Sequence, residues 1–277
     1  LDDFSKKISL LEKKFTLFNS KIIKDVLKKR SENIDLVGFH GQTILHLPNQ
    51  KISKQLGDGK LLSQETNCIV INNFRQNDLE NGGYGAPLTP IFHKLVSKMI
   101  NNKFKKKFPI SIINIGGITN VTQIINENNK LEKNLYAYDI APGNCLIDEW
   151  IRNNSNKKFD HEGKIALSGE VNDQILNQAI ENFPINSFKI SLDIKDFDTN
   201  FVKGLSIENG CATLTKYTAY LIASGLKKIN SLNKIEPKTY FVCGGGRKNN
   251  KLIDDINYFL TDKKIILENI DDFKFDG

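Results

Sequence analysis

The sequence contains no apolar run long enough to form a membrane-spanning helix. Its longest candidates, such as residues 110–115, are broken by polar residues and have the length of buried strands. The first residues also lack the apolar core of a signal peptide. These absences predict a cytoplasmic protein with no membrane partner.

Cysteine and histidine are also sparse. The four histidines do not cluster, and no two cysteines have the short spacing of a zinc knuckle or a redox pair. The sequence therefore predicts no zinc site and leaves any other metal unassigned. We expect reduced thiols, as in cytosolic proteins, at Cys68, Cys145, Cys211 and Cys243.

Basic residues exceed acidic ones, 39 to 32, which gives a net charge of +7. Such a balance can indicate a nucleic-acid partner. Here the lysines are scattered, arginines are few, and aromatic residues do not alternate with basic ones as on a base-stacking surface. We therefore predict no nucleic-acid partner, and the charge suits an anionic small molecule equally well.

The first half of the chain mixes helices and strands. Apolar residues at helical spacing predict one or two helices over residues 4–29, and a helix is expected from 88 to 100. Short apolar segments at 34–39 and 68–71 predict buried strands around a helix at 59–66. Residues 103–107 are charged and poor in apolar side chains, so we place the domain connection there.

The second half begins with a glycine-turned β-meander, whose strands are predicted at 109–115, 121–125 and 135–139. Helices are expected at 146–152, 171–179 and 212–229, a strand at 239–242, and a helix from Asn250. Both halves combine strands with helices. The prediction is an α/β protein with a first lobe over residues 1–107, a second over 108–277, and a cleft between them.

Two predicted strands end in glycine-rich turns, one at Asn114–Asn120 with Gly116 and Gly117, the other at Cys243–Gly246. Paired glycines permit tight turns and leave backbone N–H groups exposed to the oxygens of a phosphate. An ordinary hairpin can use such a pair as well. Neither turn has the spacing of the dinucleotide fingerprint or of the lysine-bearing phosphate loop.

Asp139 stands at the end of a predicted strand, before a Pro142–Gly143 turn and a helix. A carboxylate there can act as a general base on a hydroxyl or a water molecule. It can equally cap the turn or the following helix. In the first half, Arg75 can clamp a carboxylate bidentately or form a surface ion pair with Asp78. The sequence leaves these alternatives open, and a lone His40 is more often structural than catalytic.

Taken together, these segments resemble one known family, the anhydro-N-acetylmuramic acid kinases. The resemblance extends from about Asp35 to Asn249. Its motifs, in chain order, are His40-Gly41-Gln42-Thr43, Gln55-Leu56-Gly57-Asp58-Gly59, Phe74-Arg75 with Asp78, Gly82-Gly83 through Pro90, Asn114-Ile115-Gly116-Gly117, Asp139 with Pro142-Gly143-Asn144, and Cys243-Gly244-Gly245-Gly246.

The resemblance implies two actin-like (ribonuclease H-like) lobes that close over ATP, with Mg²⁺, and an amino sugar. It implies an enzyme that adds water across a 1,6-anhydro bond and phosphorylates O6, yielding N-acetylmuramic acid 6-phosphate in cell-wall recycling. A homodimer is expected from the family. The first lobe would serve the substrate and the second the nucleotide, with Asp139 as the base that activates water.

The resemblance also assigns the remaining site residues. On the sugar side it places His40, Gln42, Arg75, Asp78 and Asn144. On the nucleotide side it places Asn114, Gly116, Gly117, Gly143, Gly244, Gly245 and Gly246.

Two departures from the family pattern affect these expectations. Ala141 stands where the family usually has glycine, and its methyl group is expected to narrow the turn after Asp139. The family's Gly-Thr-Ser-x-Asp-Gly phosphate loop and its final helix are also absent, which predicts a fragment with weak ATP binding and little turnover. Another small-molecule kinase of the superfamily, a nucleotide-dependent regulator and an inactive fragment are the alternatives.

Overall fold

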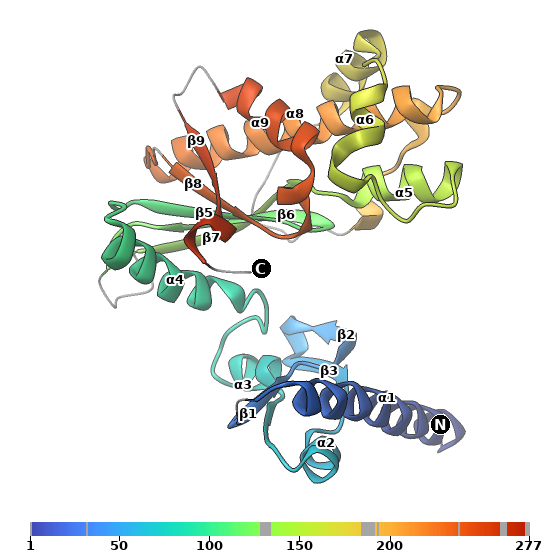
Figure 1. Cartoon of the computed structure of the whole chain (residues 1–277), viewed down its shortest axis with the longest axis vertical. Coiled ribbons are helices and arrows are strands. Elements are labelled where there is room, and N and C mark those ends of the chain that lie inside the picture. The colour runs from blue at the N-terminus through green and yellow to red at the C-terminus, as the bar shows by residue number, and fades with distance from the viewer. Residues whose placement is uncertain are drawn as a thin grey trace. The chain divides into compact units, whose positions relative to one another are not determined.

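The computed structural model describes residues 2–31, 33–127, 134–183, 192, 194–237, 239–260 and 265–274. The chain forms two compact units, residues 1–88 and residues 89–277. Figure 1 shows unit 1 in blue to cyan and unit 2 in green to red. Each unit is described by itself below.

Unit 1 combines helices with two small sheets. Strands β1 and β4 pair in parallel, and β2 and β3 form an antiparallel hairpin. The predicted helices and strands of this half are present, but the two strands, which we expected to be buried, are largely exposed. The β2–β3 hairpin and helix α3 were not predicted. The elements are α1 (Asp2–Lys29), β1 (Leu36–Phe39), β2 (Gln42–Leu47), β3 (Ile52–Leu56), α2 (Gly59–Thr66), β4 (Ile69–Asn72) and α3 (Phe74–Glu80).

Helix α1 holds the loop that leads from β3 into α2. The Glu12 carboxylate accepts a hydrogen bond from the Gly57 N–H (3.2 Å), and the Thr16 hydroxyl accepts one from the Asp58 N–H (3.0 Å). The Asp58 carboxylate caps α2 by accepting from the Leu61 N–H at 3.0 Å, as an N-cap aspartate does. The Gly57–Gly59 motif therefore starts a helix anchored on α1.

Unit 2 is built on a five-stranded sheet in the order β7-β6-β5-β8-β9. Strand β6 is antiparallel to both of its neighbours, and β5, β8 and β9 are mutually parallel. An antiparallel three-strand meander continued by two parallel strands is the ribonuclease H-like arrangement, so the predicted α/β fold class is confirmed for this unit. The strands are β5 (Ile110–Ile115), β6 (Ile118–Ile124), β7 (Leu135–Pro142), β8 (Thr239–Cys243) and β9 (Ile266–Asn269).

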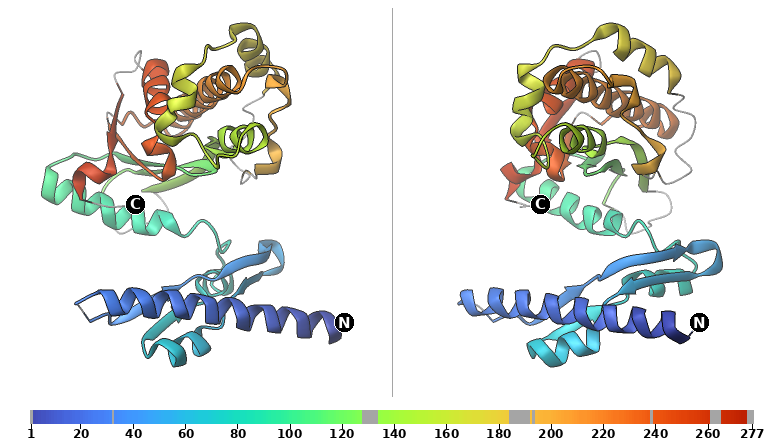
Figure 2. Two further views of the ribbon diagram at one scale, coloured as in Figure 1. Left: turned by 45° about the vertical axis from the view of Figure 1, so that its right-hand side comes forward. Right: turned by 90° about the vertical axis from the view of Figure 1, so that its right-hand side faces the viewer.

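Alternation along the central strands separates two cores. Ile113 and Ile115 face one cluster of buried side chains, which includes residues of α8 (Ile207–Asn233) and α9 (Asn250–Leu260). Ile110 and Ile112 face a second cluster with residues of α4 (Thr89–Phe104). Because successive side chains of a strand point to opposite faces, helices cover both sides of the sheet (Figure 2). The remaining helices are α5 (Cys145–Asn154), α6 (Lys164–Ser168) and α7 (Asp173–Asn182).

The boundary between the compact units lies at residues 88 and 89, whereas we placed the connection at 103–107. The reason is that α4 packs on β6 and β7 and so belongs with unit 2. His93 of α4, for example, is buried and hydrogen-bonded to the Thr122 hydroxyl of β6 at 2.8 Å. No helix in the described part of the chain is long and apolar enough to cross a membrane.

Candidate active site

Three glycine-containing turns meet at one edge of the sheet in unit 2. Strands β5, β7 and β8 run in the same direction, because β7 and β5 are both antiparallel to β6 and β8 is parallel to β5. Their carboxyl ends therefore lie side by side. The turns that follow them contain Gly116 and Gly117, Gly143 and Asn144, and Gly244 to Gly246.

The first two turns are joined through their backbones. The N–H of Gly143 donates to the Gly117 carbonyl at 2.8 Å, and the N–H of Asn144 donates to the Gly116 carbonyl at 2.7 Å. A Cβ atom at position 143 would lie 2.2 Å from the Gly116 carbonyl oxygen, so only glycine fits there.

The third turn presses on the end of β5. Gly244 has a φ of +79°, and a Cβ atom on it would lie 2.4 Å from Oδ1 of Asn114. A Cβ atom on Gly246 would lie 2.2 Å from Cγ2 of Ile115. Five of the predicted nucleotide-side positions, Asn114, Gly116, Gly143, Gly244 and Gly246, thus belong to one packed group of turns.

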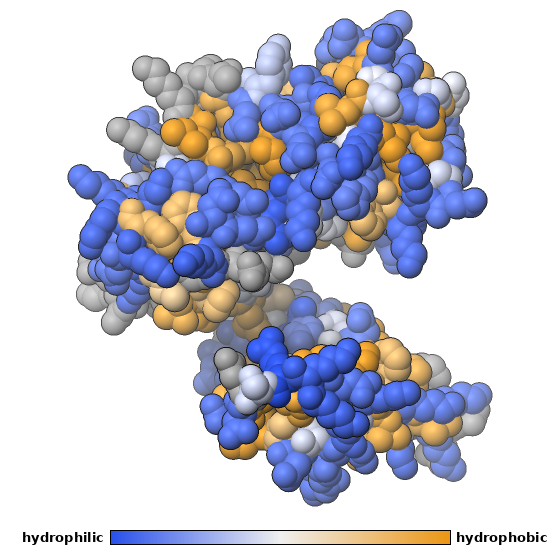
Figure 3. All heavy atoms as spheres, in the orientation of Figure 1, coloured by the Kyte–Doolittle hydropathy of each residue, from blue (hydrophilic) through white to orange (hydrophobic). Residues whose placement is uncertain are grey.

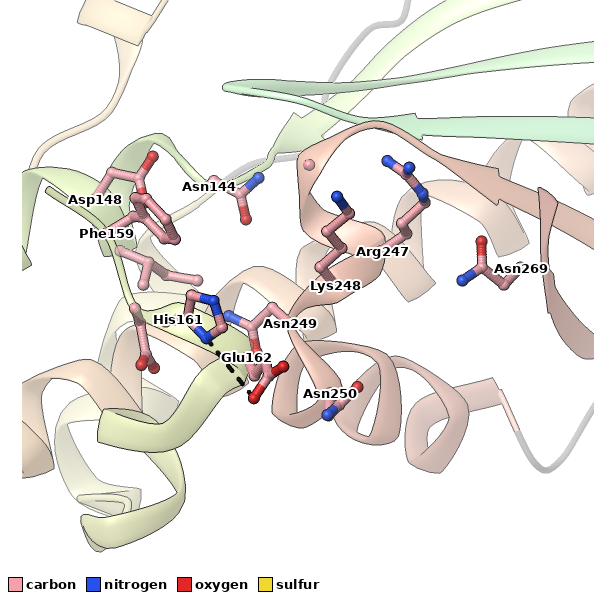
Figure 4. A pocket seen from close by; sticks show the side chains of 13 residues that line it. Asn144, Asp148, Phe159, His161, Glu162, Arg247, Lys248, Asn249, Asn250 and Asn269 are labelled. Atoms are coloured by element: carbon pink, nitrogen blue, oxygen red, sulfur yellow. Dashed lines mark ion pairs between the residues drawn. The ribbon is translucent and has the colours of Figure 1, made fainter. Parts of the chain in front are cut away.

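Beside these turns lies a cavity of about 730 Å³ (Figure 4). Its wall combines asparagine amides, basic and acidic side chains, and an aromatic pair in which Phe159 and His161 stack with ring centroids 6.1 Å apart. The lining residues are Asn144, Ile147, Asp148, Phe159, Asp160, His161, Glu162, Gly245, Arg247, Lys248, Asn249, Asn250 and Asn269. Of the predicted site residues, only Asn144 and Gly245 are among them.

Asp139 lies near the end of β7, where a β-bulge inserts Ile140 opposite the Thr119–Asn120 step of β6. Bulges commonly redirect a side chain next to a functional site. Oδ2 of Asp139 accepts a hydrogen bond from the Leu192 N–H at 3.1 Å. Burial raises the pKa of this half-buried carboxyl, and the Leu192 hydrogen bond partly offsets that rise.

The alternative that Asp139 caps the turn or the next helix has no hydrogen bond to support it in the described residues. The N-cap of α5 is Asn144, whose side chain makes no capping bond. The partner of Asp139 is instead 53 positions further along the chain. The Leu192 N–H thus holds Oδ2 of Asp139, and Oδ1 has no hydrogen-bond partner among the described residues.

Three carboxylates line the cavity, and two of them, Asp160 and Asp148, lie in different environments. Asp160 is buried and accepts hydrogen bonds from the N–H groups of Ile165 (2.8 Å) and Ala166 (3.0 Å), which fixes the start of α6. Asp148 is half-buried and accepts no hydrogen bond from a described group. Burial raises the pKa of Asp148 most, the charge of Asp160 adds to the rise, and Arg152 opposes it.

In unit 1, the structure brings His40 and Arg75 together. Nε of Arg75 donates to Nε2 of His40 at 3.0 Å, and Nδ1 of His40 lies 2.9 Å from the Gly41 carbonyl. Arginine is always a donor, so this geometry requires Nε2 of His40 to be the acceptor and Nδ1 to carry the proton. Gln42, on β2, is exposed and reaches only the Thr43 carbonyl at 3.5 Å.

Asp78 holds a loop rather than pairing with Arg75. Its Oδ2 accepts a hydrogen bond from the Gly85 N–H at 2.8 Å, and a Cβ atom on Gly83 would overlap its carboxylate. The proposed Arg75–Asp78 ion pair is therefore not formed among the described contacts. The physical reason is that Asp78 is used locally by the glycine loop, while Arg75 turns to His40.

Sequence reasoning missed several residues. One of them is His46 in unit 1. Burial lowers the pKa of His46 most, the nearby Arg75 guanidinium lowers it further, and a hydrogen bond with the Tyr84 backbone raises it. Phe159, His161 and Arg247 line the cavity without belonging to a motif that we singled out. The position of Arg247, directly after a recognised glycine turn, was the one available signal.

The family model described as anhydro-N-acetylmuramic acid kinase matches residues 3–277. The chain belongs to this family. As an anhydro-N-acetylmuramic acid kinase family member, it is a phosphotransferase that uses an alcohol group as acceptor.

Individual relatives agree with this assignment. The anhydro-N-acetylmuramic acid kinase of Pelagibacter ubique is 49% identical over 281 residues, which cover 100% of this chain and 72% of the relative. The enzyme of the same name from Brucella canis is 35% identical, with 96% and 70% covered. That of Agrobacterium fabrum is 37% identical, with 88% and 64% covered.

Among solved structures, the activator of the 2-hydroxyisocaproyl-CoA dehydratase from Clostridium difficile, with bound ADPNP, has a TM-score of 0.40 and 16% identity. The similarity covers 76% of this chain and 72% of that one. A likeness this low bears neither on the fold nor on the function of the kinase family member.

Proposed function

We propose that this chain hydrolyses the 1,6-anhydro bond of 1,6-anhydro-N-acetylmuramic acid and phosphorylates O6 with ATP, which yields N-acetylmuramic acid 6-phosphate and ADP. Membership of the family over residues 3–277 supports the reaction. The observation that carries the mechanism is Asp139, a half-buried carboxylate with a raised pKa on the strand next to the glycine turns. The proposal includes a cytoplasmic location and a homodimer.

In the proposed reaction, Asp139 removes a proton from a water molecule as the water oxygen attacks C1 of the sugar. The C1–O6 bond breaks, and O6 takes the γ-phosphoryl group of ATP while ADP leaves. The water oxygen becomes the C1 hydroxyl, and the proton on Asp139 passes to solvent. A carboxyl pKa raised by burial suits a general base, because basicity grows as the pKa approaches the working pH.

The geometry around Asp139 fits that role. The Leu192 N–H holds Oδ2, so the other oxygen remains available to a water molecule. Ile194, two residues further on, lies against Gly117, where a Cβ atom would be 3.3 Å from its Cδ1. Leu192 thus contacts the base, and Ile194 lies next to a glycine turn.

We place ATP in the cavity of unit 2, with its phosphates toward the turns at Gly116–Gly117, Gly143 and Gly244–Gly246. Close packing of these backbones excludes Cβ atoms at Gly143, Gly244 and Gly246 and keeps the turns compact. Asn144 and Gly245 lie on both the turns and the cavity wall. Backbone N–H groups in such turns suit phosphate oxygens.

We propose that Mg²⁺ enters with ATP. The described residues hold no group of three or more His, Cys, Asp or Glu side chains suited to a metal. Magnesium at a nucleotide site needs only one or two carboxylates besides phosphates and water, and Asp148 fits as one of them. When bound, the ion would neutralise charge on the transferred phosphoryl group.

On the sugar side we propose His40, Gln42, Arg75 and Asn144, with Asp78 acting through the loop it holds. N-acetylmuramic acid carries a carboxylate, and the planar guanidinium of Arg75 is suited to bind one. Nε of Arg75 is occupied by His40, which fixes the direction of the guanidinium plane.

The test uses a protein that includes the family's phosphate loop and compares it with its Asp139→Asn variant, following the 6-phosphate product by phosphorus NMR. We expect a loss of at least about 100-fold in kcat, the size of a general-base contribution, with ATP affinity retained. Asp173→Asn, an exposed aspartate in the first turn of α7, is the matched control and is expected to keep full activity.

Two results would contradict the proposal. Substantial activity in Asp139→Asn would remove Asp139 as the base. A folded, ATP-binding protein that includes the family's phosphate loop and forms no product from the anhydro sugar would favour another small-molecule kinase of the superfamily.

A further inference from the structure

Arg247 is almost completely buried, which is unusual for an arginine. Its side chain is 6% exposed, although it follows a glycine turn on the wall of the cavity. Removing a guanidinium from water is costly unless other groups satisfy it. The proposed reaction gives Arg247 no role, so its burial calls for another explanation.

The guanidinium makes two hydrogen bonds. Nη1 donates to the Gly244 carbonyl at 2.7 Å, and Nε donates to Oδ2 of Asp271 at 2.8 Å. Both bonds involve a charged group and are therefore stronger than bonds between neutral partners. Oδ1 of Asp271 is buried and has no hydrogen-bond partner, so Arg247 is the side chain that compensates this carboxylate.

These partners belong to two segments whose neighbouring residues, Gly245 and Asn269, line the cavity. Gly244 follows β8 and presses on Asn114 and Ile115 at the end of β5. Asp271 follows β9, and its N–H is held at 3.1 Å by the side chain of Asn269, which itself lines the cavity. In Figure 4 the Arg247 side chain lies between the β8 turn and Asn269. Arg247 thus joins the turn after β8 to the segment after β9.

We propose that Arg247, paired with Asp271, is a positioning residue that holds the Gly244–Gly246 turn in the conformation that binds nucleotide. It acts through the Gly244 carbonyl and does not touch the nucleotide. This inference rests on the proposed placement of ATP in the same cavity. A lysine at position 247 would lack the planar guanidinium group, so it could not make both hydrogen bonds in their present directions.

The Asp271→Asn variant distinguishes this positioning role from direct binding of phosphate by Arg247. If Arg247 positions the turn, Asp271→Asn loosens it and weakens ATP binding. If Arg247 binds phosphate, the same substitution removes a competing negative charge, and ATP binding stays equal or becomes tighter. The two roles therefore predict changes of opposite sign.

The experiment measures the Kd for ATP by calorimetry, together with KM and kcat, for Arg247→Lys and Asp271→Asn. We expect Kd and KM for ATP to rise about 10- to 100-fold in both, the effect of losing a charged hydrogen bond, while kcat per folded molecule is maintained. Arg30→Lys, an exposed arginine outside the site, is the matched control. Guanidinium ion added to Arg247→Ala is expected to restore part of the affinity.

A second readout needs no nucleotide. Amide hydrogen exchange at Gly245 and Gly246 should be faster in Arg247→Lys than in the wild type, with exchange in α8 unchanged. Unchanged exchange at the turn would overturn the inference. So would tighter ATP binding in Asp271→Asn, or a loss of kcat and melting temperature at constant KM.

The two proposals fail separately. A wild type that does not bind ATP would refute the nucleotide site and the role of Arg247 in binding. A wild type that binds and uses ATP, with variants that bind equally well, would refute only the role of Arg247.

Discussion

Ala141 occupies a position where the family usually has glycine, and we expected its methyl group to narrow the turn. The structure places Ala141 inside β7, fully buried and paired with Thr119. It is not among the residues with positive φ, so no glycine conformation is required. The methyl group is part of the core next to α8.

We therefore predict that Ala141→Gly lowers the free energy of unfolding by about 1 kcal/mol, because it removes a buried methyl group and adds backbone freedom. Turnover should not increase. Urea unfolding and a product assay on the same preparation check both parts. A clear rise in kcat would show instead that the methyl group obstructs Asp139.

Gly143 is the opposite case on the same strand end. A Cβ atom there would overlap the Gly116 carbonyl, which is rigid backbone in the neighbouring turn. Gly143→Ala should destabilise the protein by about 1–3 kcal/mol, as overpacking does, and weaken ATP binding. Chemical unfolding and calorimetry test this, and unaltered ATP affinity would argue against the phosphates lying at these turns.

At the scale of elements, His93 links α4 to the sheet and makes stability depend on pH. Burial lowers its pKa from 6.5 to about 4. Between these values the unfolded chain binds a proton that the folded chain does not. The contribution of His93 to the free energy of unfolding is therefore fully present above pH 6.5 and is lost as the pH falls toward 4. The loss is on the order of 3 kcal/mol.

Replacing His93 with glutamine should flatten the dependence of unfolding free energy on pH across this window. Urea unfolding of both proteins at pH 7, 5.5 and 4.5 provides the comparison. Equal slopes for wild type and variant would show that His93 does not remain neutral in the folded protein.

The α8–α9 pair depends on one buried carboxylate. Asp255 accepts hydrogen bonds from Lys216 at 3.0 Å and from Lys251 at 2.7 and 2.8 Å. Asp255→Asn leaves two partly buried lysines without their counter-charge and should cost about 3 kcal/mol. Asp254→Asn, at the exposed neighbouring position, is the control. Equal melting temperatures for the two variants would contradict the prediction.

At the scale of the whole molecule, the two units differ greatly in buried apolar content. Among its described residues, unit 1 buries Phe39, Leu56, Leu62 and Leu79, whereas unit 2 has two extended clusters. Leu10, Leu11, Phe18 and Ile22 on α1 remain exposed. Figure 3 shows hydrophobic residues, in orange, on the surface of unit 1.

Because burial of apolar surface is the main stabilising contribution, unit 1 should open more easily than unit 2. Hydrogen-exchange mass spectrometry should show faster exchange in β1 and β4 than in β5 and β8. Uniform protection of all four strands would contradict two units of unequal stability.

Much of this architecture was predictable because its signals are local. The strands around Ile110–Ile115 and Thr239–Cys243 follow from apolar runs that end in glycine. From these ends we predicted the nucleotide side. The pairings that complete the site are not local. Leu192 reaches Asp139 across 53 positions, and Asp271 reaches Arg247 across 24. No spacing rule links such residues.

Unit 1 shows the same limit. Its β2–β3 hairpin turns through Pro48–Gln50 and a left-handed Lys51, without the Asn-Gly or Asp-Gly pair that marks a tight hairpin in sequence. Asp78 has two chemically reasonable partners, the Arg75 side chain and the glycine-loop amides. Only the path of the backbone after α3 decides that Asp78 accepts a hydrogen bond from the Gly85 N–H.

The common direction of β5, β7 and β8 also divides the sheet of unit 2 into a constrained edge and a permissive one. Strands β7, β8 and β9 all begin at the edge away from the glycine turns. Changes of length there should leave the spacing of Asp139, Gly143 and Gly244 unaltered. This edge is accordingly where a fluorescent label, an affinity tag or an inserted domain can be attached while the chemistry at the opposite edge is left intact.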